Sequence, residues 1–389
     1  MTRPGLSHRF AAFYFLLLLP VGLQAPYLFL FFKRRGLTDP QLGTLAAVAP
    51  IVTIFAPPLW GALADRLGDR RITLALLLAG AGLIFPWLAV APTFPLLLSL
   101  MVLFSAFAAS PAAIADAITL EHVERTRGDY GRLRLWGSVG FAAPLLLSGL
   151  FLERSAGGSP AALYPIFAGF ALFRLLSAGW VRMLPKSHAA QGRKLDWHAA
   201  RVFTAPAFLA LALCAIVGGG AMSAYYLYFS IYLDQIGIAD NLKGYFWVIA
   251  VASETTMMLG VGALIRRIGL KWTFVLSLLG VALRLFAFSF PLGPGAVALV
   301  QCLHALTFTT FTISTITFIS RLVPPHLRAS GQTLWLALTA GLGSAVGSKL
   351  AGAAAQAYDL QGMFRLFSLA AAAAMLAAIM LVREPKAEQ

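Results

Sequence analysis

The chain has 389 residues, of which 59% are hydrophobic and only 12% are charged, and its mean hydropathy is +0.81. Soluble domains carry about 25% charged residues, so this composition excludes a soluble enzyme, a disordered chain and a secreted disulfide scaffold, and it indicates a protein of the lipid bilayer. The net charge of +15 would suggest a nucleic-acid partner in a soluble protein. In a membrane protein we attribute it instead to basic cytoplasmic loops, and we expect no nucleic acid.

Runs of about 20 apolar residues, the length that crosses a bilayer core about 30 Å thick, occur twelve times. In chain order they lie at 9–32, 41–64, 72–91, 94–119, 132–152, 161–184, 205–233, 242–265, 272–290, 295–320, 330–353 and 358–382. The runs are unbroken rather than alternating, so they predict helices and not a β-barrel. The sequence therefore predicts an all-α membrane protein with twelve transmembrane helices.

Basic residues predict the orientation of these helices. If the N-terminus is cytoplasmic, 21 lysines and arginines fall on the cytoplasmic side, 6 on the opposite side and 3 within spans. Cytoplasmic loops of membrane proteins carry such an excess, so both termini are expected in the cytoplasm. The cluster Lys33, Arg34 and Arg35 on the opposite side is the one local exception.

An internal repeat divides the chain into two halves. An offset of 201 residues places Gly36 on Gly237, Asp39 on Asp240, Gly43 on Gly244, Gly61 on Gly262, Arg66 on Arg267, Gly68 on Gly269 and Arg70 on Lys271. Because six spans separate the copies, they have the same orientation and form parallel repeats. We expect an N-terminal six-helix bundle at 1–184, a cytoplasmic loop at 185–204 and a C-terminal six-helix bundle at 205–389.

The loop between the second and third spans carries a recognisable motif, Gly61-Ala-Leu-Ala-Asp65-Arg66-Leu-Gly68-Asp69-Arg70-Arg71. It resembles the signature loop of the major facilitator superfamily, Gly-x-Leu-x-Asp-Arg-x-Gly followed by two basic residues. The resemblance implies a gating motif in which loop arginines and a helix N-terminus compete for Asp65. Asp69 departs from the family pattern, which usually has a basic residue there.

A narrower resemblance is carried by three stretches, Tyr130-Gly-Arg-Leu-Arg134-Leu-Trp-Gly, Pro111-Ala-Ala-Ile-Ala-Asp116 and Ala224-Tyr225-Tyr226. They are similar to the phenylpropionate-permease branch of the superfamily, a relative of the lac permease and the nucleoside–proton symporters. The resemblance implies a symporter of the bacterial inner membrane that imports a small organic solute, perhaps an aromatic acid, together with protons. A proton-driven exporter of drugs or metabolites and a sugar or nucleoside symporter are the alternatives. An enzyme, a metal site and a cofactor are not expected, and the expected oligomeric state is a monomer.

Among the ionisable residues within predicted spans, Glu254 lies about halfway along the span 242–265, Arg284 in the outer half of 272–290 and His304 about ten residues into 295–320. They match the carboxylate, arginine and histidine that lac permease relatives use in proton coupling and substrate contact. A charge at mid-bilayer costs about 2.5–3.5 kcal/mol on insertion scales, so each residue needs a reason to be there. A drying cavity favours a protonated carboxylate and a nearby arginine favours the ionised form, so movement of the arginine could switch the proton. A static Glu254–Arg284 pair and a simply packed histidine are the structural alternatives.

Other polar residues within spans are candidates for substrate binding. Asp116 and Arg134 are expected to form an ion pair between the fourth and fifth spans, either as a substrate site or as a tie at the gate. The aromatic residues near the predicted binding depth could form a cage, although aromatic belts at the membrane interface also predict some of them. The substrate-binding candidates are Gln24, Tyr27, Asp116, Arg134, Tyr225, Tyr228, Glu254 and His304.

Overall fold

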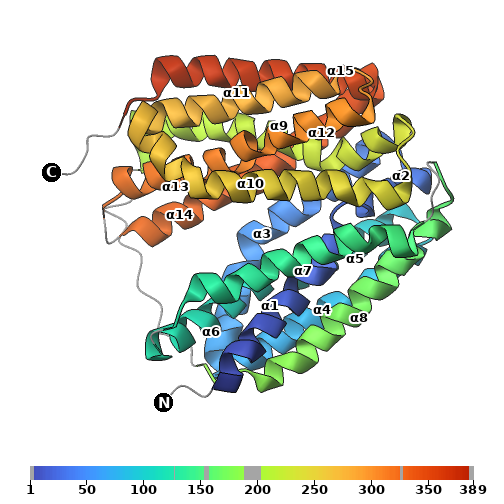
Figure 1. Cartoon of the computed structure of the whole chain (residues 1–389), viewed down its shortest axis with the longest axis vertical. Coiled ribbons are helices and arrows are strands. Elements are labelled where there is room, and N and C mark those ends of the chain that lie inside the picture. The colour runs from blue at the N-terminus through green and yellow to red at the C-terminus, as the bar shows by residue number, and fades with distance from the viewer. Residues whose placement is uncertain (1–3, 127, 153–156, 188–202, 325–326, 385–389) are drawn as a thin grey trace. The chain divides into compact units, whose positions relative to one another are not determined.

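The computed structural model describes residues 4–126, 128–152, 157–187, 203–324 and 327–384, and these residues form helices joined by short connections (Figure 1). The helices up to residue 183 are α1 Pro4–Gln24, α2 Leu28–Arg34, α3 Asp39–Leu67, α4 Arg70–Val90, α5 Phe94–Ala108, α6 Pro111–Thr126, α7 Tyr130–Phe151, η1 Pro160–Leu163, α8 Tyr164–Trp180 and η2 Val181–Met183. The later helices are α9 Pro206–Gln235, α10 Asp240–Ile268, α11 Leu270–Phe288, α12 Pro294–Cys302, η4 Ala305–Thr310, α13 Phe311–Leu322, α14 Arg328–Leu336, η6 Ala337–Gly343 and α15 Ser344–Leu381.

Among the described residues, eleven helical segments are long and apolar enough to cross a membrane. Ten of them correspond to the first ten predicted spans. The last segment, Ser330–Leu381, has 52 residues and contains both remaining predictions. Asp359 interrupts its regular backbone with φ of 64°. Most of the predicted loop 185–204, namely residues 188–202, lies outside the described residues.

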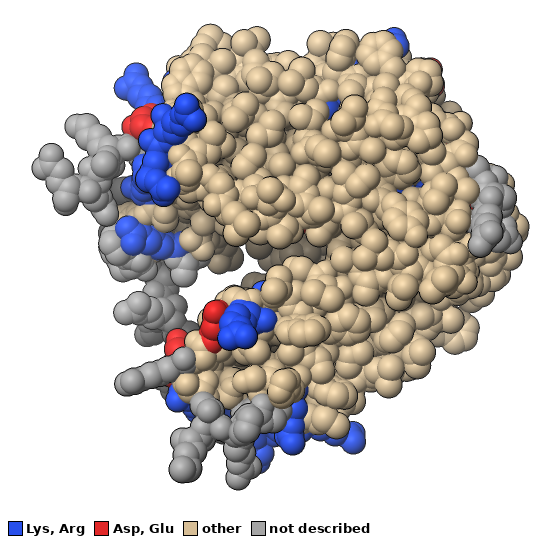
Figure 2. Space-filling view, in the orientation of Figure 1, with Lys and Arg blue, Asp and Glu red and all other residues tan. Residues whose placement is uncertain are grey.

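Contacts between residues group the chain into two units. The first contains Met1–Gly36, Ile51–Gly192 and Ala239–Tyr245, and the second contains Leu37–Pro50, Arg193–Ile238 and Phe246–Gln389. The first turns of α10 thus pack within the first unit, and the first turns of α3 pack within the second. On the face shown in Figure 2, the broad surfaces of the helices are almost entirely tan, with only isolated blue side chains, as expected for surfaces that contact lipid.

The first unit explains why Arg34 and Arg35 break the charge rule. Arg34 lies 2.7 Å from the carboxylate of Asp240, which Lys243 also contacts at 2.6 Å, and the side chains of Asp240 and Lys243 are fully buried. Arg35 donates hydrogen bonds to the carbonyl groups at the end of α4, including that of Ala89 at 2.9 Å. These arginines therefore bind internal partners, and their place in the chain follows from packing rather than from the orientation of loops.

In the second unit, helix α15 packs closely against α9 through small residues. A Cβ atom at Gly347 would overlap the backbone of Gly220 and lie 2.6 Å from the hydroxyl of Ser223. Gly352 makes a similarly close approach to Gly43 in the first turns of α3. Small residues at such spacing let helix backbones approach closely in membranes.

Backbone geometry reproduces the internal repeat. Gly36 and Gly237 have φ of 85° and 80°, and Gly68 and Gly269 have φ of 70° and 86°. A side chain at these four positions would be strained, which explains why the turns before and after α3 and α10 contain glycine. The two helices also have equal lengths of 29 residues.

Candidate functional site

Three ionisable side chains of the second unit form one chain of contacts. Glu254 lies in α10, Arg284 in α11, and His304 between α12 and η4. The Nε2 atom of His304 is 3.2 Å from Oε2 of Glu254, and its Nδ1 atom is 2.6 Å from Nη1 of Arg284. The structure thus brings together the three residues that the sequence indicated for proton coupling, with the histidine between the other two.

These contacts define the protonation state of His304. A guanidinium group can only donate hydrogen bonds, so Nδ1 of the ring accepts one from Arg284 and carries no proton. The ring proton then lies on Nε2, which faces the carboxylate of Glu254. His304 is therefore neutral when both contacts are made, and a second ring proton requires Arg284 to move away.

Arg284 is held from several other directions, and it is only 2% exposed. Its Nη1 atom donates to the hydroxyl of Thr307 at 3.1 Å, and Nη2 donates to the side-chain carbonyl of Gln301. The guanidinium carbon lies 3.8 Å from the ring centroid of Tyr225, a cation–π contact. A buried charge without partners would cost several kcal/mol, so this surrounding set of polar and aromatic groups is what keeps the arginine inside the bundle.

Glu254 and His304 are the two groups of this cluster that can bind a proton. A proton on Glu254 neutralises the carboxylate and leaves the contact between His304 and Arg284 intact. A proton on Nδ1 of His304 places two donors and two positive charges against each other, so it displaces Arg284. The side chain of Glu254 is 19% exposed and that of His304 is 6% exposed, which makes Glu254 the more accessible to water.

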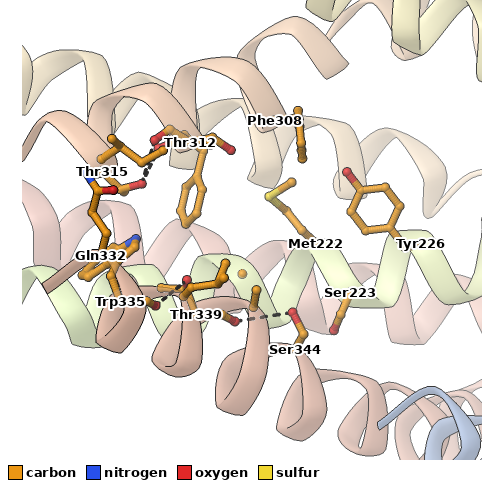
Figure 3. A pocket seen from close by; sticks show the side chains of 15 residues that line it. Met222, Ser223, Tyr226, Phe308, Thr312, Thr315, Gln332, Trp335, Thr339 and Ser344 are labelled. Atoms are coloured by element: carbon orange, nitrogen blue, oxygen red, sulfur yellow. Dashed lines mark hydrogen bonds between the residues drawn. The ribbon is translucent and has the colours of Figure 1, made fainter. Parts of the chain in front are cut away.

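A cavity of about 420 Å³ lies beside this cluster in the second unit. Figure 3 shows its wall, which is built from α9, from η4 and α13, and from α14, η6 and the start of α15. Tyr226 and Phe308 belong to the wall, and their ring centroids lie 6.2 and 5.7 Å from that of His304. Both η4 and η6 are π-helical, an irregularity that is frequent at functional sites.

Tyr225 and Tyr226 have different surroundings although they are adjacent. Tyr225 is 2% exposed and receives a 3.1 Å hydrogen bond from the amide of Gln301, behind the wall. Tyr226 is 36% exposed and lines the cavity. Of the two, the structure therefore places only Tyr226 in the cavity wall.

Tyr27 and Tyr228 lie inside the protein, with exposed fractions of 2% and 1%. Tyr27 donates to the backbone carbonyl of Asp240 at 3.2 Å, and Tyr228 donates to Oδ1 of Asp39 at the same distance. Both hydroxyl groups thus hold the first residue of a long helix. Gln24 is the last residue of α1 and is partly buried.

In the first unit, Asp116 of α6 and Arg134 of α7 form the predicted ion pair, with 3.8 Å between Oδ1 and Nε. Tyr14 of α1 donates a 2.7 Å hydrogen bond to the same carboxylate oxygen, and its ring lies 5.5 Å from the guanidinium of Arg134. Both charged side chains are about one-third exposed, so the pair stabilises the fold by at most about 1 kcal/mol.

The first part of the motif loop forms the end of α3. Gly61, Asp65 and Arg66 lie in its last turns and are exposed, and Gly68 makes the turn that follows with its positive φ. Within the described part of the chain Asp65 forms no ion pair. The N-terminus of α4 is capped by Asp69.

The second part of the motif loop ties α4 to its surroundings. Asp69 accepts a hydrogen bond from the backbone of Arg71 and pairs with its side chain at 2.8 Å. The hydrogen bond from the Arg71 side chain lowers the pKa of Asp69. Arg70 lies 3.8 Å from Glu121 of α6 and donates to Ser187 at 3.2 Å. The residue that departs from the family pattern is therefore the helix cap.

Gln301 and Tyr14 complete the two polar clusters, and neither is among the site candidates predicted from the sequence. Gln301 precedes His304 by one helical turn in an apolar segment, so the two share a face, and this spacing could have indicated it. Tyr14 offered only its position in the first span. The cavity residue Trp335 was also missed, because its role depends on how α14 packs against α9.

Comparisons with known proteins agree with these features. Residues 8–368 match the sequence profile of the MFS_1 like family. Maltose permease of Geobacillus stearothermophilus is 26% identical over 382 residues, which cover 97% of this chain and 95% of the permease. The probable 3-phenylpropionic acid transporter of Escherichia coli (strain K12) is 25% identical over 322 residues, covering 79% of this chain and 80% of the transporter. A crystal structure of the nucleoside transporter NupG aligns with a TM-score of 0.83 at 19% identity, covering 97% of this chain and 98% of that one.

The family match spans most of the chain, and the related proteins are membrane transporters rather than enzymes. Their names give different solutes, so they share the activity class and not one substrate. The long apolar helices described above provide the membrane-crossing architecture that such an activity needs. The chain belongs to the MFS_1 like family, and it is a multi-pass membrane transporter of the major facilitator superfamily.

Proposed function

We propose that this protein is a proton-coupled symporter that imports a small organic solute by alternating access. The observation that carries the proposal is the contact chain Glu254–His304–Arg284 inside predicted membrane spans. Glu254 binds the proton and loses its charge. His304 contacts both Glu254 and Arg284, so the change in charge alters the contacts of the ring, and Arg284 moves in response. Three ionisable groups in contact within a membrane are costly to insert, and such groups commonly mark proton pathways.

Several finer features belong to the same proposal. The helical segment Ser330–Leu381 would be roughly 78 Å long if straight, which exceeds twice the bilayer core, and Asp359 interrupts it. We therefore propose twelve spans in two bundles of six, at 1–184 and 205–389, with 185–204 as the connecting loop. The basic residues support cytoplasmic termini, and the bacterial origin of the relatives is consistent with the inner membrane. We further propose that the protein is a monomer.

The remaining candidate residues receive roles from their surroundings. We assign solute contact to the cavity beside His304, with Tyr226 in its wall, and structural roles to Tyr27, Tyr225 and Tyr228. The Asp116–Arg134 pair and the motif residues from Gly61 to Arg71 are assigned to the inner gate. Asp69 contributes to that gate as the cap of α4.

The test uses the full-length protein in proteoliposomes with radiolabelled uridine, maltose and 3-phenylpropionate. An imposed inward proton gradient should drive inward accumulation of one of these probes, and a sodium gradient alone should not. Glu254→Gln should abolish accumulation while exchange of labelled for unlabelled probe continues. Glu124→Gln, on the exposed side of α6, is the matched control.

The outcomes separate the alternatives. Outward transport driven by the proton gradient would identify an exporter. Accumulation driven by a sodium gradient alone would identify sodium, and not the proton, as the coupling ion. If Glu254→Gln still concentrates the probe normally, the coupling role assigned to this residue is wrong.

A further inference from the structure

The cavity beside His304 differs from the cluster behind it in its lack of formal charge. None of the described residues that line it is an aspartate, glutamate, lysine or arginine. Aromatic side chains of Tyr226, Phe308, Phe311 and Trp335 supply flat apolar surface from three helical segments. Surfaces of this kind suit a ring-bearing solute.

Six hydroxyl groups belong to the wall; those of Tyr226 and Thr312 can donate as well as accept, and the other four donate to the backbone. Ser223 donates its hydroxyl proton to the carbonyl of Gly220 at 2.7 Å, and Ser344 donates to that of Thr339 at 3.4 Å. Thr315 and Thr339 donate to carbonyl groups one turn earlier, at 2.8 and 2.9 Å. These four hydroxyl groups therefore already donate their protons to backbone carbonyls, and each oxygen retains lone pairs that can accept a hydrogen bond from a solute.

A carboxylate would be poorly matched to this cavity. It offers only acceptors, so among the lining residues it would find hydrogen-bond donors at Tyr226, Thr312 and Gln332 but no cation. Arg284 does not belong to the wall, and its terminal nitrogens contact His304, Thr307 and Gln301. Removing a carboxylate from water without a paired cation is costly. Gln332 can both donate and accept, so it is compatible with either kind of solute.

We propose that this cavity binds an uncharged, ring-bearing solute rich in hydrogen-bond donors, and that it discriminates against aromatic carboxylates. Polyhydroxylated solutes with an aromatic ring, such as nucleosides and aryl glycosides, have this chemistry. The proposal rests on the cavity being the solute site of the proposed transporter, and it replaces the aromatic acid suggested by the sequence. The ring would lie against the aromatic wall, and the hydroxyl groups would donate to Thr315 and Thr339.

The experiment measures binding by calorimetry to the full-length protein in detergent, without a membrane gradient. The probes are uridine, phenyl β-D-glucoside, 3-phenylpropanol and 3-phenylpropionate, the last two being a pair that differs in charge at one end. At least one hydroxylated ring compound should bind, and 3-phenylpropionate should bind at least about tenfold more weakly than it. Thr315→Val and Thr339→Val should each weaken binding of the hydroxylated compound about two- to tenfold, the usual effect of one hydrogen bond.

The control is Thr317→Val on the same helix as Thr315. Its hydroxyl likewise donates to a carbonyl one turn earlier, at 2.7 Å, and it does not line the cavity. Preferred binding of 3-phenylpropionate, absence of binding by all four probes, or equal affinities for the three threonine variants would each overturn the proposal. Preferred binding of a neutral compound whose transport ignores the proton gradient would instead reject proton coupling and leave this proposal standing.

Discussion

Tyr27 and Tyr228 stand 201 residues apart, and each donates a hydroxyl hydrogen bond to an aspartate at the start of a long helix. Tyr27 reaches the carbonyl oxygen of Asp240 in the first unit, and Tyr228 reaches Oδ1 of Asp39 in the second, both at 3.2 Å. The two aspartates are separated by the same interval. The internal repeat therefore reproduces a side-chain contact as well as the positions of its glycines.

Removing either hydroxyl should weaken its unit. Tyr27→Phe and Tyr228→Phe should each lower the free energy of unfolding by about 0.5–1.5 kcal/mol, the usual net value of a hydrogen bond. Thermal unfolding in detergent measures the change. Tyr164→Phe, at a tyrosine that is 46% exposed, serves as the control and should have no measurable effect. If only one of the Tyr27→Phe and Tyr228→Phe variants loses stability, the two hydrogen bonds are not energetically equivalent.

Gln301 should be essential for keeping Arg284 buried. Gln301→Leu removes the acceptor of Nη2 and leaves a charged donor without its partner, so it should destabilise the protein by about 1–3 kcal/mol. Chemical unfolding followed by tryptophan fluorescence provides the measurement. Gln235→Leu changes an exposed glutamine at the end of α9 and should be close to neutral. Equal stability of the two variants would contradict the support assigned to Gln301.

The ion pair between Asp69 and Arg71 should make stability depend on pH. Because the folded state lowers the pKa of Asp69, its stabilisation is present above the ordinary value of about 4 and is lost as the pH falls through the folded value. Asp69→Asn keeps a good helix cap but removes the charge, so it should cost about 0.3–1 kcal/mol at pH 7 and less at pH 3.

A matched control for the charge at position 69 exists at the start of α7. Asp129 also caps its helix, accepting from the backbone of Arg132 at 3.2 Å. Asp129→Asn should retain the cap and show a smaller pH-dependent loss. Thermal unfolding of both variants at pH 7 and pH 3 makes the comparison, and identical pH profiles would refute the role of Arg71.

Gly347 should not tolerate a side chain. Gly347→Ala places a methyl group against the backbone of Gly220, so α15 must move away from α9, at a cost of about 1–3 kcal/mol. Gly260→Ala in α10 meets nothing within 4 Å and should be neutral or stabilising by up to about 1 kcal/mol. Thermal unfolding of the two variants tests the difference. A stabilised Gly347→Ala would exclude the tight packing described here.

The sequence predicted those features that follow from local composition. Apolar runs located the helices to within a few residues in most cases, because a bilayer requires uninterrupted hydrophobic length. The repeat correctly paired Gly36 with Gly237 and Gly68 with Gly269, since only glycine suits their positive φ. The boundary near Asp359 is visible in sequence as a polar break but not as the unusual backbone found there.

The candidate site was harder to predict because it depends on tertiary contacts. Charge within predicted spans, together with the resemblance to lac permease relatives, singled out Glu254, Arg284 and His304, yet their order of contact was not evident from sequence. The separation of Tyr225 from Tyr226 required knowing which face of α9 meets Gln301. Hydrogen bonds from side-chain hydroxyl groups to backbone carbonyls, such as that from Thr339, are likewise evident only from the structure.

The π-helical segment η4 changes which way the two ends of one helix face. His304 and Thr315 are eleven residues apart, and in an uninterrupted α-helix about 100° per residue would return them to nearly the same direction. The widened turn at Ala305–Thr310 offsets the later residues by about one position. His304 can thereby face Arg284 while Thr315 faces the cavity. Deleting a single residue from this segment would turn His304 and Thr315 toward nearly the same direction, so the widened turn is what allows one helix to contact both the ionisable cluster and the cavity.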